Sequence, residues 1–404
     1  MSGDSSRGEL FARLLPTPEQ TLLLRCLLLP REQAAEAWAD WLEITGDTRV
    51  LLRPGARSVR GLNVALLDAL RRNGLDAPPE TLSVLKLAAL KEEMRSQAYR
   101  RVLAGTLHAL ARHEVPVIVS KGAALAGTAY PHPALRHCHD IDLLVAPAEL
   151  ERAALAATEA GFRDATPQPP QREGSRRLVH LDGLPLELHT RPLPGTASPA
   201  LVEDWWSAAR TVRLSGADTR TASSTLGLLQ VCALAFFTPA RSSLRWVTDC
   251  WHIIHGDEPP GWTELCAAAH HAQLSRCLSV MLGYLASALH APVPPAVLRD
   301  LSDAADGERL GGERALYAVW STTRRNLATL RWMLGGRKLR GDVLRWALAP
   351  SAAYLRPGYA SARDRRLLPL AYVQRPLRFA LERVHVRLQR RRTRNGASLR
   401  TASP

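Results

Sequence analysis

The chain has few of the features that mark secreted or membrane-spanning proteins. Among its 404 residues there are six cysteines, which are scattered and form no CxxC pair, so neither a disulfide framework nor a structural zinc site is predicted. No basic segment followed by an apolar run opens the sequence, and we therefore expect no secretory signal. Arginines and prolines interrupt every apolar stretch before it reaches the roughly 18 residues that span a bilayer. These absences favour a cytoplasmic protein.

Acidic residues are scarce at one end of the chain, and this scarcity explains the formal net charge of +15. Residues 321–404 carry 20 Lys and Arg against three acidic residues, whereas the preceding residues carry 33 basic and 35 acidic ones. The body is therefore close to neutral. An anionic partner is expected of the C-terminal segment alone.

Within this basic segment, residues 377–392 have the pattern of an amphipathic helix, with leucines and a valine on one side and arginines around them. Such a helix can dock on the protein body, lie on an anionic membrane or bind nucleic acid. Few aromatic residues accompany the arginines, which disfavours stacking on nucleic acid. We rank docking first, contact with an anionic inner-membrane surface second and nucleic acid third. The last residues, 390–404, are expected to be disordered.

The N-terminal stretch has the pattern of packed helices. Thr17 followed by Pro18 is typical of a helix start. Through 79–110, apolar residues recur every three to four positions, and the other face is polar. We expect helices up to residue 112.

The next stretch has the pattern of a small mixed sheet. A β-branched run at 115–119 predicts a buried strand, and a second strand is expected at 140–145. A helix is expected at 147–160. Asp182-Gly183, between two apolar runs, predicts a hairpin with a two-residue turn.

Beyond residue 200 only helical patterns are evident, at 226–237, 244–255, 262–271, 273–289 and 314–334. The expected fold is α+β. Its parts are an N-terminal helical region at 1–112, a small mixed β-sheet core at 113–200, a C-terminal helical region at 201–335 and a basic tail at 336–404.

Two aspartates open the strand at 140–145. Because side chains alternate along a strand, Asp140 and Asp142 should face one way while Ile141 and Leu143 face the core. Neighbouring carboxylates repel each other, and a hard divalent ion such as Mg²⁺ relieves that repulsion.

Glu187 lies opposite the leucines in the hairpin segment 184–188, and His189 follows on the same side. If this strand lies beside the first, three carboxylates converge on one patch of sheet. Such a patch suits one or two Mg²⁺ ions that bridge a nucleoside triphosphate and an attacking oxygen. The alternative, a solvated Glu187 on a half-exposed hairpin, stays open at this point.

Ser120-Lys121-Gly122 follows the first predicted strand and precedes a helical pattern. Glycine allows close backbone approach, a helix N-terminus favours phosphate, and Lys121 supplies a positive charge for a triphosphate. The segment is not a Walker A motif, because GxxxxGK[ST] is absent. A simple turn remains the alternative.

The run VSKGAALAGTAYPHPALRHCHDIDLLV, followed later by LPLELHTRP, resembles the uncharacterised nucleotidyltransferase family of the polymerase-β-like superfamily. The resemblance implies that Lys121 and Gly122, beside Ser120, hold the triphosphate. It also implies that Asp140 and Asp142 bind Mg²⁺, with Glu187 as the third carboxylate. Arg136 and His189 match positions near the nucleotide.

The expected function is transfer of a nucleoside monophosphate from an NTP to an unknown acceptor, with release of pyrophosphate. The acceptor can be a small molecule, a peptide or a protein. Glu187 is the best candidate for the base that takes the acceptor's proton. Two other functions remain open: a catalytically silent nucleotide-binding regulator, and a membrane-surface accessory protein of a polysaccharide or peptide-modification pathway.

Overall fold

The computed structural model describes residues 15–46, 61–164, 174–193, 199–237 and 244–305, together with positions 48, 51, 59, 308, 369 and 372. The chain divides into two compact units, 1–330 and 331–404, and every element below belongs to the first. The helix expected at 314–334 and the amphipathic stretch at 377–392 lie outside the described residues. The region boundaries at 112, 200 and 335 remain predictions.

The N-terminal helices form where the sequence predicts them, and they are α2 (Pro18–Leu28), α3 (Arg31–Thr45), α5 (Asn63–Asn73) and α6 (Pro79–Arg112). Thr17 begins α2 with a capping box: its side chain accepts from the Gln20 amide while the Gln20 side chain accepts from the Thr17 amide. Gly46, at φ 64°, ends α3 in the left-handed conformation that glycine adopts without strain.

A seven-stranded mixed sheet confirms the α+β fold. Its strands are β1 (Val117–Ser120), β2 (Ile141–Val145), β3 (Phe162–Asp164), β4 (Ser175–His180), β5 (Pro185–His189), β6 (Arg210–Leu214) and β7 (Ala217–Thr221). The spatial order is β3-β4-β5-β2-β1-β7-β6. β2 runs antiparallel to β1 and parallel to β5, and β1 runs parallel to β7. Strands β1, β2 and β5 are therefore neighbours at the centre.

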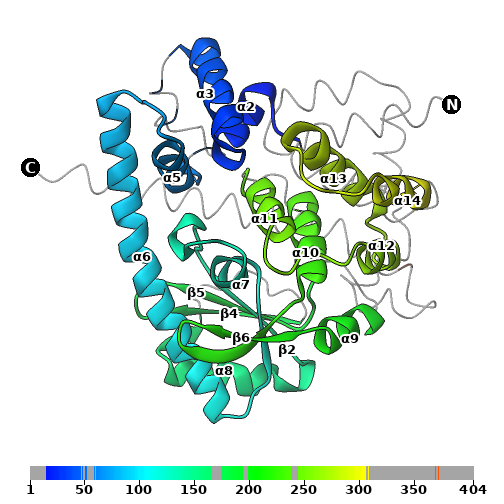
Figure 1. Cartoon of the computed structure of the whole chain (residues 1–404). Coiled ribbons are helices and arrows are strands. Elements are labelled where there is room, and N and C mark those ends of the chain that lie inside the picture. The colour runs from blue at the N-terminus through cyan, green and yellow to red at the C-terminus, as the bar shows by residue number, and fades with distance from the viewer. Residues whose placement is uncertain are drawn as a thin grey trace, which may run out of the picture. The chain divides into compact units, whose positions relative to one another are not determined.

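The two faces of the sheet contribute to two hydrophobic cores. Ile141 and Leu143 belong to one core together with Leu103 of α6 and side chains of α8 (Leu150–Glu159). Leu144 belongs to the other core, with residues from the C-terminal helices. Because side chains alternate along β2, Asp142 lies on the face of Leu144. In Figure 1, α6 and α8 lie side by side near the sheet, which agrees with their direct contacts.

The strands β6 and β7 correct the expectation that only helices follow residue 200. They form a hairpin through Ser215 and Gly216, both at positive φ (52° and 86°), as a two-residue turn requires. Arginine, aspartate and threonine alternate along these strands with few apolar residues. The period-2 hydrophobic signal is therefore weak, and only the Ser-Gly turn marked the hairpin.

The predicted hairpin around Asp182-Gly183 forms, but its loop has three residues and not two. The Gly183 amide donates to His180 O (2.8 Å), and the His180 amide donates to Leu184 O (2.8 Å). Gly183, at φ 82°, therefore takes the last position of the loop. This arrangement is the common alternative to a two-residue turn.

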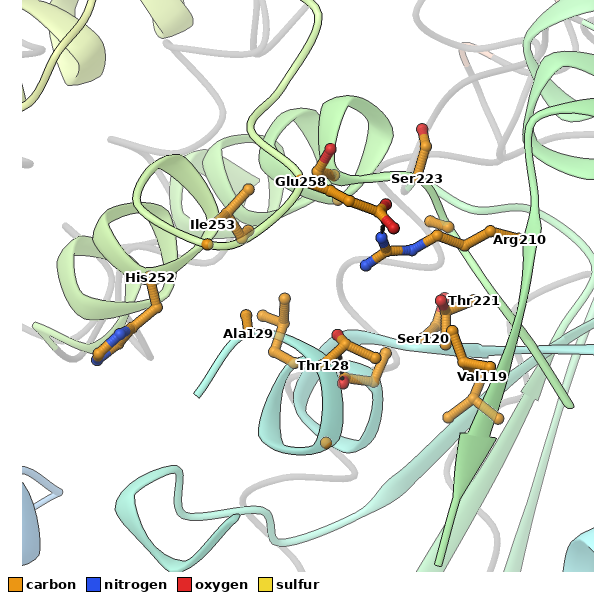
Figure 2. A pocket seen from close by; sticks show the side chains of 18 of the residues that line it. Val119, Ser120, Thr128, Ala129, Arg210, Thr221, Ser223, His252, Ile253 and Glu258 are labelled. Carbon is orange, nitrogen blue, oxygen red and sulfur yellow. Dashed lines mark hydrogen bonds and ion pairs between the residues drawn. The ribbon is translucent and has the colours of Figure 1, made fainter. Parts of the chain in front are cut away.

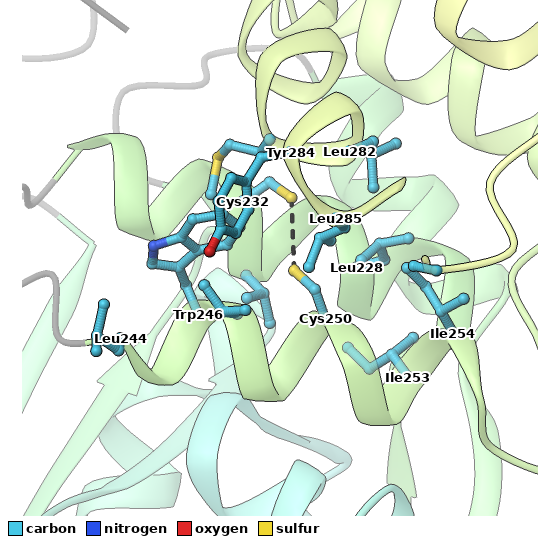
Figure 3. Close-up of a cluster of buried hydrophobic side chains, with 14 of the residues drawn as sticks. Leu228, Cys232, Leu244, Trp246, Cys250, Ile253, Ile254, Leu282, Tyr284 and Leu285 are labelled. Atoms are coloured by element: carbon cyan, nitrogen blue, oxygen red, sulfur yellow. Dashed lines mark hydrogen bonds between the residues drawn. The ribbon is translucent and has the colours of Figure 1, made fainter. Parts of the chain in front are cut away.

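The remaining helices are α7 (Lys121–Thr128) after β1 and, beyond the hairpin, α9 (Pro199–Ser207), α10 (Ser224–Phe237), α11 (Arg245–Ile254), α12 (Trp262–His271), α13 (Ser275–Leu289) and α14 (Pro295–Ala305). Figure 3 shows how α10, α11 and α13 pack through Leu228, Ile253 and Leu285, with the buried thiols of Cys232 and Cys250 3.8 Å apart. The described helices include none with the length and apolarity that a membrane crossing requires.

Candidate active site

A row of polar side chains crosses four neighbouring strands on one face of the sheet. Ser120 of β1 pairs with Asp142 of β2, and Asp142 pairs with Glu187 of β5. Glu187 in turn pairs with Arg177 of β4. Residues paired across strands share a face, so the register alone brings these four side chains together. Asp142 lies near the middle of the row and is 3% exposed.

Asp142, Glu187 and His189 form a group that could hold a metal ion. One ligand atom from each lies within 4.8 Å of the others. His189 Nε2 is 2.8 Å from Asp142 Oδ1 and 3.6 Å from Glu187 Oε2. The sequence-based expectation that Glu187 and His189 share a side with the aspartate strand is thus realised by the parallel pairing of β2 with β5.

Lys121 compensates the charge of Asp142 directly. Its Nζ donates to Asp142 Oδ1 at 2.5 Å and lies 3.2 Å from His189 Nε2. Lys121 has φ 55°, a conformation that costs a non-glycine residue on the order of 1 kcal/mol and often occurs at functional sites. The backbone amide of Lys121 donates to the buried side chain of Gln230 in α10 (3.3 Å). The strand-to-helix turn is therefore fixed at both its backbone and its side chain.

The pKa values of Asp140 and Asp142 shift in opposite directions. Burial alone would raise the pKa of Asp142, but Lys121 and the hydrogen bond from His189 lower that pKa to about 2. Burial, and then the adjacent charge of Asp142, raise the pKa of Asp140 to about 6. Asp142 is therefore ionised at neutral pH, whereas ionisation of Asp140 lowers the stability of the fold.

Asp140 lies outside the group of Asp142, Glu187 and His189 that could hold a metal ion. It precedes the first ladder residue of β2, Ile141, so strand alternation does not fix its side chain as it fixes Asp142. Its Oδ2 is 3.3 Å from His139 Nε2, and its backbone carbonyl accepts from the Tyr99 hydroxyl (3.0 Å). Asp140 still influences the group electrostatically, because its pKa responds to both Asp142 and Glu187.

Arg136 occupies a buried ion pair apart from the carboxylate group. Its Nε and Nη2 donate to the two carboxylate oxygens of Asp249 in α11 at 2.8 and 2.9 Å. Its Nη1 donates to the His137 carbonyl at 2.6 Å. The Tyr130 hydroxyl also donates to Asp249 (2.7 Å). The structure thus places Arg136 as a link between the loop before β2 and α11, and Asp249 as a carboxylate bonded within the core.

Gly122 lies against this buried pair. A Cβ at Gly122 would approach Arg136 Nη1 to 3.1 Å and Cys138 Sγ to 3.2 Å. Close packing of α7 on the loop before β2 therefore accounts for glycine here, whether or not its backbone also contacts phosphate.

Two residues near the site were not expected from the sequence. Arg177 lies opposite Glu187 in the hairpin, with its Nε 3.8 Å from Glu187 Oε1. The expected two-residue turn would have paired Glu187 with Leu178, so Arg177 comes opposite Glu187 only because the loop has three residues. Gln230 bridges the Lys121 amide and the Pro192 carbonyl. It lies about 110 positions from Lys121, and no local signal marks it.

Carboxylates on two adjacent strands, beside a lysine at a strand-to-helix turn, can hold a divalent ion and attract phosphate groups. A family model described as uncharacterised nucleotidyltransferase matches residues 58–290. This match spans more than half of the chain and includes every residue of the site. The protein therefore belongs to the uncharacterised nucleotidyltransferase family. No curated protein and no solved structure matches the chain.

Proposed function

We propose that the protein transfers a nucleoside monophosphate from an NTP to an acceptor oxygen with the help of Mg²⁺, and releases pyrophosphate. One observation carries the proposal: Asp142, Glu187 and His189 converge from two paired strands to within 4.8 Å, next to the Lys121 ammonium. Membership of the nucleotidyltransferase family supports the reaction class.

The donor set fits a hard divalent ion. Asp142 and Glu187 each offer carboxylate oxygens, the ligands that Mg²⁺ prefers. Asp142 is almost fully buried and stays ionised, which a fold tolerates where a cation compensates the charge. Asp142 and Glu187 would hold the ion, with Asp140 close by. Bound there, Mg²⁺ would supply charge neutralisation at the α-phosphate and alignment of the attack.

The side chains around the carboxylates have separate tasks in this proposal. Lys121 and Arg177 supply positive charge to the triphosphate from opposite sides of Glu187 and Asp142. His189 holds Asp142 in place through its 2.8 Å hydrogen bond. Glu187 is partly exposed, so it can take the proton of the acceptor hydroxyl. The acceptor oxygen forms a bond to the α-phosphorus as the bond to the bridging oxygen of pyrophosphate breaks.

The test is release of pyrophosphate from each NTP with Mg²⁺, in the presence of mixed small-molecule, peptide and protein acceptors. We expect Asp142→Asn to abolish the release, because the buried anion is lost. Asp182→Asn, at a 73% exposed loop position, is the matched control and should retain activity. Glu187→Gln provides a second variant at a less buried position, in case Asp142→Asn fails to fold. Unchanged release by a folded Asp142→Asn protein would exclude the site.

The contact of Lys121 with Asp142 favours a second function, in which the protein binds a nucleotide without turnover. The ammonium group already neutralises the buried carboxylate at 2.5 Å, as it would in a protein that binds nucleotide without turnover. Calorimetry separates the two functions. A regulator binds an NTP without producing pyrophosphate, and Lys121→Gln should then weaken binding without any catalytic effect to measure.

A further inference from the structure

Exposed apolar side chains gather on one face of helix α6. Of the seven large apolar side chains that are exposed among the described residues, four lie on this helix. These four are Val84, Leu87, Leu90 and Met94, and their exposed fractions are 38%, 50%, 60% and 65%. Steps of three and four residues put them on one side of the helix, opposite Leu85 and Leu103, which are buried in the two cores. We call this apolar stripe the outer face of α6.

Positive charge borders the outer face. The exposed basic residues beside it are Lys86, Lys91, Arg100 and Arg101. Lys91 and Arg101 lie four and seven residues beyond Leu87 and Met94, so they share the side of the stripe. None of the four basic side chains has an ion pair or a hydrogen bond with another described residue. Their charge is therefore available to a partner.

The acidic residues of α6 do little to offset this charge. Glu92 pairs with His137 at 2.8 Å, and its side chain is 12% exposed. Glu93 accepts a hydrogen bond from Gln97 (3.0 Å) and is 35% exposed. Glu80 is exposed but lies in the first turn, where the helix dipole favours an acid. The fold therefore makes a cationic and apolar face on a body whose total charge is close to neutral.

Arginines elsewhere in the described part of the chain show how such charge is compensated. Arg213 pairs with Asp218 at 3.2 Å. Figure 2 shows a cavity of about 320 Å³ between α7, the β6–β7 hairpin and α10, and Arg210 at its wall is paired with Glu258. The four basic residues beside the outer face have no such partner among the described residues, and so they attract an external anion.

The partner of the outer face must be anionic and must offer an apolar layer. A second copy of the chain would bring the same four basic residues together, and the stretch 377–392 is itself rich in arginine. Like charges in contact oppose both pairings. An anionic bilayer presents acidic headgroups above hydrocarbon and so matches both features of the face. It can also bind the basic residues of 321–404 at the same time, and stable peripheral binding commonly takes two signals.

We propose that the outer face of α6 lies on an anionic lipid bilayer. Its apolar side chains insert at the level of the headgroups, and the long side chains of Lys91 and Arg101 bring their charges to the lipid phosphates. In Figure 1 the first half of α6 lies at the margin of the described elements, where a flat surface can reach it. On the other side of the helix, the Tyr99 hydroxyl donates to the Asp140 carbonyl (3.0 Å), so the bound helix holds the candidate active site close to the bilayer. Lipid binding by this face requires neither nucleotide nor metal.

The first experiment measures flotation of the full chain with vesicles of equal parts phosphatidylserine and phosphatidylcholine, without nucleotide or metal. Leu90→Gln changes a side chain that is 60% exposed, so the fold should be kept. We expect this variant to need about fivefold more lipid for half-maximal binding, because part of the inserted apolar surface is lost. The matched control, Leu181→Gln, changes a 73% exposed leucine of the β4–β5 loop and should bind as the natural protein does. Equal binding by the two variants, or no binding by the natural protein, would overturn the proposal.

The second experiment locates the contact with a fluorophore whose emission depends on its surroundings. Cys266→Ser leaves only the five buried cysteines, and Met94→Cys then adds one reactive thiol on the outer face. Adding the anionic vesicles should strengthen the emission and shift it to shorter wavelength, because the label enters an apolar layer. Vesicles of phosphatidylcholine alone should cause little change. The same label on a Leu181→Cys protein is the control, and an equal response there, or none at Met94→Cys, would place the outer face away from lipid.

Other occupants of the outer face give other results. If a second copy covers it, the natural protein sediments as a dimer without lipid, and Leu90→Gln releases the monomer. If an acidic protein covers it, the label on the Met94→Cys protein gives no response to vesicles. Each result overturns the proposal and leaves nucleotidyl transfer intact. Failure to release pyrophosphate from any NTP, in turn, leaves lipid binding by α6 intact.

Discussion

Asp140 and Asp142 are separated by one residue, yet their surroundings favour opposite protonation states. Lys121 and His189 stabilise the charge of Asp142, which is fixed in the β2 ladder. Asp140 has no comparable cation contact within the ladder, and burial, followed by the negative charges of Asp142 and Glu187, raises its pKa. An ionised Asp140 therefore destabilises the fold and is available to a metal ion.

The first prediction concerns the stability of Asp140→Asn. Because the folded pKa of Asp140 is raised to about 6, its ionisation costs stability above that pH, and the cost fades as pH falls toward the unfolded value. In EDTA at pH 8 the variant should melt at a higher temperature than the natural protein, and the difference should shrink at pH 5. A variant that melts lower at pH 8 would refute the argument.

The second prediction concerns Arg177, which lies on the same face as Glu187. Arg177→Gln should raise the KM for the NTP by about tenfold with a smaller change in kcat, because one positive charge near the triphosphate is lost. Its neighbour Arg176 points to the other face and pairs with Asp164 and Glu151. Steady-state kinetics of Arg176→Gln should therefore match the natural protein. Equal effects of both changes would place the triphosphate elsewhere.

At the scale of elements, the sequence was informative wherever apolar spacing was strong. Helix α6 was predicted because its three-to-four periodicity is long, and strand β2 was predicted because four of its five residues are apolar. The β6–β7 hairpin was missed because only one face of it is buried and polar residues alternate along it. Tertiary packing, and not local propensity, selects the strand conformation there.

The candidate site was predictable to the extent that strand register determines it. Asp142, Glu187 and His189 share a face because of period-2 alternation and the β2–β5 pairing. Arg136 shows the limit: its partner Asp249 lies more than 100 positions away in α11, and no local pattern links them. Sequence alone could not tell a nucleotide-binding arginine from this buried ion pair.

The third prediction concerns the link that Arg136 and Asp249 make between the loop before β2 and α11. Asp249→Asn leaves a buried guanidinium without its counter-charge, which typically costs about 3–5 kcal/mol of unfolding free energy. Urea unfolding measures the loss. Asp218→Asn breaks an ion pair whose side chains are 70% and 73% exposed and should cost no more than about 1 kcal/mol. Similar losses of unfolding free energy in the two variants would show that the ion pair of Arg136 with Asp249 does not stabilise the fold.

At the scale of the whole molecule, charge is concentrated at the C-terminal end. Residues 321–404 hold 20 Lys and Arg against three acidic residues, while the body that contains the site is nearly neutral. Recruitment to an anionic surface would therefore depend on residues other than those of the candidate active site. Peripheral association with the inner membrane surface remains a proposal that follows from this distribution.

The fourth prediction tests that proposal by flotation with liposomes that contain anionic lipid. The full chain should float at low salt and lose association at high salt, because the attraction is screened. A chain that ends at Leu370 should float less, and neutral liposomes serve as the control. Equal flotation of both chains would remove the membrane role of the basic tail and support docking of the amphipathic stretch on the body, which the sequence pattern ranks first.

The contact between Lys121 and Asp142 has a consequence for the order in which reactants arrive. A bare cation from solution must compete with an ammonium group that is already seated against the acid. A metal–triphosphate chelate brings phosphate oxygens that attract the same ammonium, so the incoming substrate itself can draw the lysine aside. We therefore expect the metal and the nucleotide to bind together. Without the triphosphate, the protein should not bind free Mg²⁺ at concentrations that are sufficient for binding when the triphosphate is present.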